Sequence, residues 1–72
     1  MNEDYWYKII GGNIRSSRVT RGITQKDLGL KLNISRPSIA NIEAGRQRIQ
    51  VHFLFQLAEA LDTSIQDLIN IS

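Results

Sequence analysis

The fold is decided by residues 24–43, TQKDLGLKLNISRPSIANIE, which predict two short helices joined by a tight turn. Thr24 and Asp27 have the spacing of a capping box, in which side chain and backbone at a helix start hydrogen-bond to each other. Asn33 tolerates the left-handed backbone conformation that ends many helices. Ser35 is a good N-cap for the second helix. Two helices this short need a scaffold on which to bury their apolar sides.

The rest of the chain predicts three more helices. Asp4 is a candidate N-cap for the first, and Ile10 and Ile14 share one of its faces. Ser64 and Asp67 repeat the capping-box spacing and predict a short last helix. We therefore expect one all-α domain, residues 1–72, with five helices at about 5–20, 24–32, 35–44, 51–61 and 64–70.

The fourth expected helix is strongly apolar. Its apolar residues recur at separations of three and four: Val51, Leu54, Phe55, Ala58 and Leu61. This is the period of an amphipathic helix. The spacing predicts that these five side chains form the apolar face of the helix.

Charge is distributed unevenly along the chain. The net charge is only +2, but all nine basic residues lie between Lys8 and Arg48, where only Asp27 and Glu43 oppose them. Residues 51–72 contain acids and no base. Such asymmetry favours contact between one side of the molecule and a polyanion. Charge alone does not distinguish DNA from RNA or from an anionic membrane surface.

Composition argues against several kinds of site. The 72 residues include no cysteine, so disulfides and thiolate–metal sites are excluded. The chain has one histidine, His52, and no metal-ligand cluster, phosphate-binding glycine loop or useful carboxylate pair. We expect no enzyme activity, metal, cofactor or small-molecule ligand. No apolar run is long enough to span a membrane.

A pattern of apolar, small and charged residues at characteristic positions extends over about residues 10–69. Within the helix pair its members are Thr24, Gln25, Leu28, Gly29, Leu32, Ile34, Ile39, Ile42, Glu43 and Gly45. Outside the pair they include Gly11, Ile14, Arg15, Arg18, Gly22, Leu57, Ala58, Leu61, Ser64, Ile65 and Leu68. Together they resemble the helix-turn-helix of the lambda-repressor-like family, also called the XRE family. Asn33 and Asp62 stand where that family usually has glycine.

The resemblance implies a compact five-helix fold that binds double-stranded DNA and regulates transcription. It also implies a cytoplasmic, nucleoid-associated protein of bacterial or phage origin. It also implies a homodimer on a palindromic operator, most often as a repressor. Two other settings stay open: an antitoxin that neutralises a toxin protein, and a restriction–modification controller or prophage switch. RNA is less favoured, because no aromatic residues alternate with the basic ones at stacking positions.

The second helix of the pair carries the candidate base-reading residues. Asn41 has the donor and acceptor for a bidentate contact to adenine, and Arg36 has the donors for guanine or for a phosphate. Pro37 offers only an apolar contact. The whole candidate set is Ser35, Arg36, Pro37, Ser38 and Asn41. The alternative is that Arg36 and Asn41 are ordinary solvated residues.

Candidate phosphate contacts surround this helix. Arg46 and Arg48 lie in the loop that follows it, and Gln25 begins the helix that, by resemblance, crosses the DNA backbone. Lys26, Lys31 and Arg15 are weaker candidates, because surface cations are usually just solvated. Separately, the resemblance implies a partly buried ion pair, Arg18 with Glu43, that fixes the angle of the recognition helix.

Surplus apolar residues suggest where a second subunit docks. Trp6, Phe53, Ile69 and Ile71 exceed what so small a core requires. They are the candidates for the dimer interface, although packing in the core is an alternative role for Phe53 and Ile69.

Overall fold

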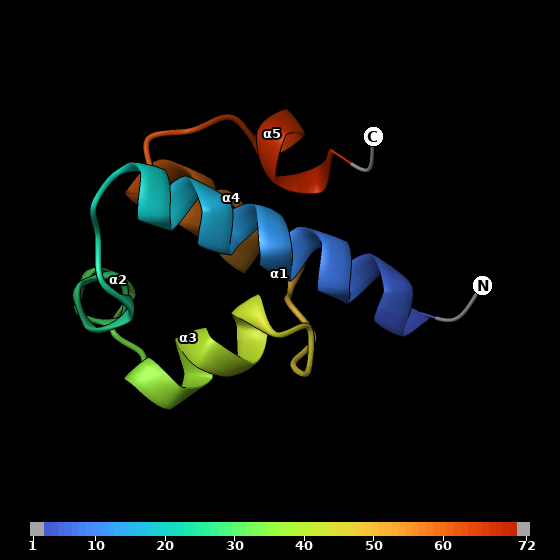
Figure 1. The fold of residues 1–72 in the computed structure, drawn as a ribbon, viewed down its shortest axis with the longest axis horizontal. Coiled ribbons are helices and arrows are strands. Elements are labelled where there is room, and N and C mark those ends of the chain that lie inside the picture. The colour runs from blue at the N-terminus through green and yellow to red at the C-terminus, as the bar shows by residue number, and fades with distance from the viewer. Residues whose placement is uncertain (1–2, 71–72) are drawn as a thin grey trace.

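Five helices make up the part of the chain that the computed structural model describes, residues 3–70 (Figure 1). They are α1 (Glu3–Thr20), α2 (Gln25–Leu32), α3 (Arg36–Glu43), α4 (Val51–Ala60) and α5 (Ile65–Ile69). The all-α, five-helix prediction is confirmed. One detail at the start is wrong: α1 begins at Glu3, so Asp4 lies inside its first turn rather than capping it.

The turns around α2 and α3 are held as the sequence predicts. The Asp27 N–H donates to Thr24 Oγ1 at 3.0 Å, and the Thr24 N–H donates to the Asp27 carboxylate at 3.4 Å. Asn33 ends α2 in the left-handed region, with φ 58° and ψ 42°. Ser35 caps α3, because its hydroxyl accepts from the Ser38 N–H at 3.3 Å.

The start of α5 forms only half of the expected capping box. Ser64 Oγ accepts from the Asp67 N–H at 3.1 Å. The Asp67 carboxylate, however, accepts from the Thr63 hydroxyl at 3.1 Å, and no reciprocal bond from the Ser64 backbone is found within the described residues. The hydroxyl of the preceding residue competes for the carboxylate and replaces the backbone donor.

The core draws on every helix. Its fully buried side chains are Ile14, Leu28, Ile39, Ile42, Leu57, Leu61 and Leu68. Each side chain of this kind contributes about 1.5–3 kcal/mol on leaving water. Helix α1 runs across the molecule with α3 below it and α5 above it, as Figure 1 shows, and it contacts both. The core therefore joins α3 to the scaffold along its Ile39 and Ile42 side.

Two glycines allow the helices to approach closely. A Cβ on Gly29 would lie 2.6 Å from the Ile34 carbonyl oxygen, so the tight α2–α3 turn requires a residue without a side chain. A Cβ on Gly11 would lie 2.3 Å from the Ile42 carbonyl oxygen and 2.7 Å from that of Glu43. The backbone of α1 thus rests directly on the C-terminal end of α3.

The predicted apolar face of α4 is partly wrong. Leu57, Ala58 and the following Leu61 are buried, but Val51 is 72% exposed and Phe55 is 56% exposed. Helix α4 is apolar almost all round, so a spacing of three and four does not select one face. Contact with the other helices selects the face, and two large apolar side chains remain in solvent.

Candidate nucleic-acid interface

Helix α3 presents a polar and small-residue face to solvent. Arg36, Pro37 and Asn41 are exposed, Ser38 is half-buried, and the opposite side of the helix enters the core. Ser35 lies just before the helix, and its hydroxyl is 3.0 Å from that of Ser38, so both serines are engaged at the cap. The structure therefore brings the five candidate base-reading residues together at one end and one face of α3.

A buried ion pair joins α3 to α1. Arg18 Nε donates to Glu43 Oε2 at 2.6 Å, and Arg18 Nη2 donates to Glu43 Oε1 at 3.0 Å. Arg18 Nη1 also donates to the Ile23 carbonyl at 2.8 Å, which ties the pair to the turn before α2. The hydrogen bond to Glu43 raises the pKa of Arg18, against the opposing effect of burial. The pair expected from the resemblance is thus present, and it sits at the end of α3 on which Gly11 rests.

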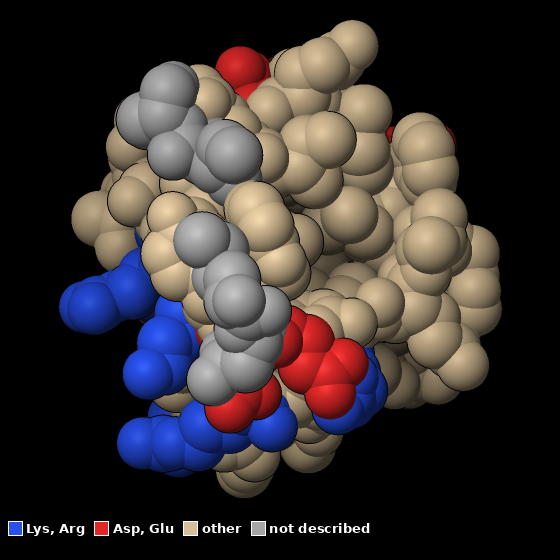
Figure 2. All heavy atoms as spheres, turned by 90° about the vertical axis from the view of Figure 1, so that its right-hand side faces the viewer, with Lys and Arg blue, Asp and Glu red and all other residues tan. Residues whose placement is uncertain are grey.

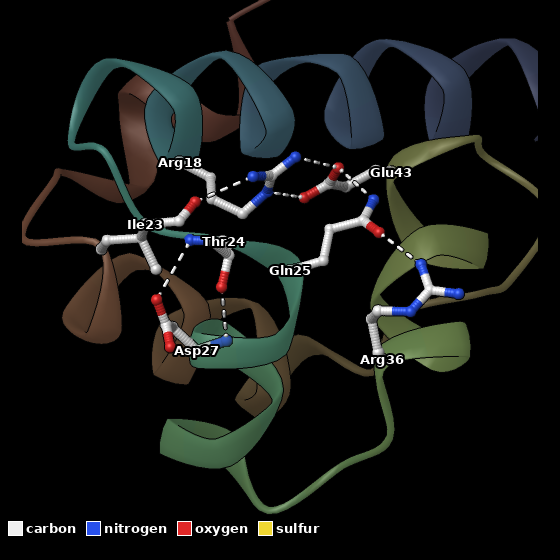
Figure 3. A network of polar contacts seen from close by, with 7 residues as sticks. All are labelled: Arg18, Ile23, Thr24, Gln25, Asp27, Arg36 and Glu43. Atoms are coloured by element: carbon white, nitrogen blue, oxygen red, sulfur yellow. Dashed lines mark hydrogen bonds and ion pairs between the residues drawn. The ribbon is translucent and has the colours of Figure 1, made fainter.

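The ion pair continues into a relay that reaches the surface of α3 (Figure 3). Gln25 Nε2 donates to Glu43 Oε1 at 3.0 Å, and Arg36 Nη1 donates to Gln25 Oε1 at 3.0 Å. Because the carboxylate only accepts and the guanidinium only donates, these two partners fix which way the Gln25 amide points. The relay therefore holds the Arg36 side chain toward α2.

An open groove runs beside this relay. Its lining residues come from α1, α2 and α3 and the turn before α2: Arg15, Arg18, Thr24, Gln25, Lys26, Arg36, Ala40, Glu43 and Ala44. Arg15, Lys26 and Arg36 are exposed, and Ala40 and Ala44 leave room between α3 and the basic side chains. Four of the predicted phosphate or base contacts, those at Arg15, Gln25, Lys26 and Arg36, thus border one open groove.

Basic side chains also gather on one side of the molecule. Figure 2 shows Lys and Arg along the lower and left margins of the face that it presents, whereas the upper right carries neither. Helices α4 and α5 contain no Lys or Arg. The uneven charge of the sequence is therefore uneven in space as well.

The two loop arginines differ in their surroundings. Arg46 is exposed, and its backbone N–H donates to the Asn41 carbonyl at 2.9 Å, which keeps it next to α3. Arg48 donates through both terminal nitrogens to the Glu3 carboxylate, and its guanidinium carbon lies 5.8 Å from the centre of the Tyr7 ring. Sequence reasoning did not anticipate this partner for Arg48.

Two further cations lie near the helix pair: Lys31, which the sequence analysis predicted as a weaker candidate, and Lys8, which it missed. Lys31 is exposed near the C-terminal end of α2, in a hollow that Gln56 and Glu59 also line. Lys8 lies against the turn after α3, because a Cβ on Gly45 would be 2.7 Å from Lys8 Cα. The sequence does contain a signal for Lys8: with Gly11, Arg15 and Arg18 it follows the spacing of one helix face.

The candidate dimer residues are placed unequally. Trp6 and Ile69 are 41% and 44% exposed. Phe53 is half-buried and packs against the core, in keeping with the alternative role considered for it. Ile71 lies outside the described residues.

Two kinds of site are absent from residues 3–70. No group of three or more His, Asp or Glu side chains is arranged to hold a metal ion there. None of the helices in this part of the chain is long and apolar enough to cross a bilayer.

A short helix exposed on one side, set after a tight turn and flanked by basic residues, defines a helix-turn-helix protein of the DNA-binding kind. The chain belongs to the HTH_3 helix-turn-helix family, which is the XRE, or lambda-repressor-like, family, and its pattern matches residues 14–68. The expected family is thereby confirmed. The fold is that of DNA-binding transcription regulators.

Relatives agree with this assignment. An uncharacterised HTH-type transcriptional regulator of Sinorhizobium fredii, y4dJ, is 31% identical over 62 residues, covering 86% of this chain and 80% of the relative. The restriction–modification controller protein C.AhdI of Aeromonas hydrophila has the same fold, with a TM-score of 0.87, 22% identity, and coverage of 94% of this chain and 99% of that one. The controller C.Esp1396I, solved as a tetramer with its natural 35 base-pair operator, has a TM-score of 0.76 at 23% identity, covering 92% and 97%.

Proposed function

We propose that this chain is a cytoplasmic, sequence-specific regulator that binds double-stranded DNA as a homodimer and represses transcription by occupying an operator. The observation that carries the proposal is the exposed face of α3, whose Arg36 is held by the relay through Gln25 to Glu43. A side chain oriented before binding loses less conformational freedom when it contacts a base.

Helix α3 suits the major groove, which is about 12 Å wide and admits one helix. Asn41 is exposed midway along it, where a bidentate contact to adenine is the favoured specific pairing of an amide. Arg36 begins the helix and offers its remaining N–H groups to guanine or to a phosphate. Each well-formed base contact contributes about 1–3 kcal/mol of discrimination.

Phosphate contacts are proposed on both sides of α3. Arg15 and Lys26 border the groove on one side, and Lys8 and Arg46 lie near the turn at the other end of the helix. On this proposal, the cations contact two stretches of DNA backbone that flank one groove. Each neutralised phosphate steepens the dependence of log affinity on log salt by about 0.9.

The proposed dimer uses α4 and α5, the two helices that contain no Lys or Arg, together with the N-terminal turns of α1. Val51, Phe55 and Ile69 are large apolar side chains exposed on α4 and α5, and Trp6 is exposed on α1. A second copy that covers them leaves the basic side free for DNA. C.Esp1396I, a chain of the same fold solved as a tetramer on its operator, offers a precedent. Two recognition helices of a dimer would then lie about 34 Å apart, one turn of DNA.

Selection of bound duplexes from a random pool at a stated salt concentration tests the proposal. We expect an enriched motif with two related half-sites. Asn41→Ala should relax the preference at one base pair in each half-site, whereas Gln66→Ala, an exposed amide on α5, should leave the motif unchanged. A pool that shows no enrichment, or a motif indifferent to Asn41→Ala, would refute base reading by α3.

A further inference from the structure

The N-terminal turns of α1 engage the loop that follows the recognition helix. These turns precede residue 14, where the family pattern begins. Glu3 accepts hydrogen bonds from both terminal nitrogens of Arg48. The Tyr7 ring, one turn further along α1, lies 5.8 Å from the same guanidinium. Figure 2 looks onto this end of the molecule and shows acidic side chains touching basic ones in its lower part.

Arg48 lies on the side of the molecule that we propose faces the DNA. Its loop leaves α3 directly, and the loop is fixed to α3 by the bond from the Arg46 N–H to the Asn41 carbonyl. Arg48 also lines a hollow together with Ser38 of α3 and Ile34 of the turn between α2 and α3. A side chain at this place, freed from Glu3, lies beside the proposed path of the DNA backbone.

The Glu3 carboxylate accepts the same pair of hydrogen bonds from Arg48 that a phosphate would accept. A guanidinium presents its N–H groups as a planar fork that matches either a carboxylate or a phosphate in a bidentate pair. The guanidinium of Arg48 cannot form this bidentate pair with the Glu3 carboxylate and a phosphate at the same time. DNA must therefore displace Glu3 to use it.

On this geometry, we propose that Glu3 is an intramolecular competitor for the phosphate that Arg48 binds. It lowers the affinity of the chain for DNA of any sequence and so increases the share of binding that depends on base contacts. The inference rests on the proposed function, since it presupposes binding to a DNA backbone.

The ion pair between Glu3 and Arg48 is exposed, so another anion can replace Glu3. The side chain of Arg48 is 66% exposed and that of Glu3 is 57% exposed, so water and salt reach both. The hydrogen bond to Arg48 lowers the pKa of Glu3. Exposed ion pairs are weak, and the release of one corresponds to an affinity change of about two- to fivefold.

The experiment compares Glu3→Gln with Asp4→Asn, using fluorescence anisotropy of a labelled random-sequence duplex between about 50 and 200 mM salt. Both variants remove one negative charge from the same turn of α1, but Asp4 forms none of the ion pairs found within residues 3–70. We expect Glu3→Gln to bind about two- to fivefold more tightly than Asp4→Asn, with a steeper salt dependence.

A double-mutant cycle assigns the effect to Arg48. In an Arg48→Ala background, Glu3→Gln and Asp4→Asn should have equal affinities, because the group for which Glu3 competes is gone. Equal affinities of the two variants in the wild-type background would overturn the inference, as would a Glu3→Gln gain that survives Arg48→Ala. Failure of the wild-type chain to bind any duplex would instead overturn the proposed function, so the two failures are distinct.

Discussion

The two ends of the core are held by different kinds of contact. Between α1, α2 and α3 the helices meet through a glycine, a buried ion pair and a relay of side-chain hydrogen bonds. Around α4 and α5 the buried contacts are apolar, and α4 has no side chain capping its N-terminus. The polar contacts to α1 on this side lie nearer the surface: Asn13 donates to the Leu68 and Asn70 carbonyls, and Arg21 pairs with Asp62. Polar contacts demand particular atoms at particular distances, whereas apolar contacts accept several registers.

This difference has a functional consequence. The α1–α3 side carries the helix that we propose reads bases, and directional contacts fix the position of this helix. The α4–α5 side leaves apolar surface exposed at Val51 and Phe55, and the second copy that we propose to cover it would need no unique set of hydrogen bonds. We therefore expect the two sides to respond differently to substitution.

The largest effect is expected from the ion pair. Arg18→Met leaves the Glu43 carboxylate buried without its cation, and loss of one partner from such a pair typically costs about 3–5 kcal/mol of unfolding free energy. Urea denaturation followed by circular dichroism measures this cost. DNA affinity should fall as well, because Glu43 anchors the relay to Arg36.

Arg21→Met is the matched control for this substitution. Arg21 pairs with Asp62, but both side chains are exposed, at 41% and 94%. An exposed pair contributes about 0–1 kcal/mol. If urea unfolded the two arginine variants with equal free energies, the Arg18–Glu43 ion pair would not be what holds α1 to α3.

A smaller but still large effect is expected at the helix crossing. Gly11→Ala places a Cβ against the backbone oxygens of Ile42 and Glu43, which cannot rotate away. We expect a loss of about 1–3 kcal/mol as α3 is pushed outward. Gly12→Ala is the control: its Cβ meets nothing within 4 Å, so it should stabilise the helix by about 1 kcal/mol.

Thermal melting of both alanine variants distinguishes the two glycines. Opposite shifts are the expected result. Equal shifts of either sign would mean that the close approach of α1 to α3 is not limiting and that only helix propensity matters.

The sequence predicted the polar side better than the apolar side, for the same physical reason. The capping box at Thr24, the left-handed Asn33 and the cap at Ser35 each depend on a few local atoms, so a short motif is enough to identify them. The face of α4 depends on where other helices lie, and spacing alone placed Val51 and Phe55 wrongly.

Long-range partners were harder still to predict from the residues. Glu3 and Arg48 are far apart in the chain, and nothing local pairs them. Lys8 was missed because no motif includes it, although its helix-face spacing with Gly11 was visible. The buried pair of Arg18 with Glu43 came from family resemblance, not from pattern.

An intermediate effect is expected from the relay. Gln25→Ala removes the bond that holds Arg36 toward α2, and a single hydrogen bond of this kind contributes about 0.5–1.5 kcal/mol. The preference at the base pair that Arg36 contacts should change. Lys26→Ala, on the next residue, should instead weaken binding to all sequences alike, because a phosphate contact carries no sequence information.

Selection from a random pool with each variant makes this comparison. A changed motif for Gln25→Ala and an unchanged motif for Lys26→Ala support the relay. If both variants kept the wild-type motif, Gln25 would contact only the DNA phosphate backbone. The orientation of Arg36 would then not depend on Gln25.

The smallest effect on stability is expected on the apolar side, at Phe55. This side chain is 56% exposed, so Phe55→Gln should change the unfolding free energy of the subunit by less than about 0.5 kcal/mol. Leu57→Ala, two residues along the same helix but fully buried, should cost about 2–5 kcal/mol.

Sedimentation equilibrium tests the role that we propose for Phe55 in the dimer. The dimer should dissociate about tenfold more readily in Phe55→Gln, as expected for loss of one well-packed aromatic contact. A wild-type chain that stays monomeric at high micromolar concentration, or a variant that dimerises as well as the wild type, would show that this exposed apolar surface is not the interface.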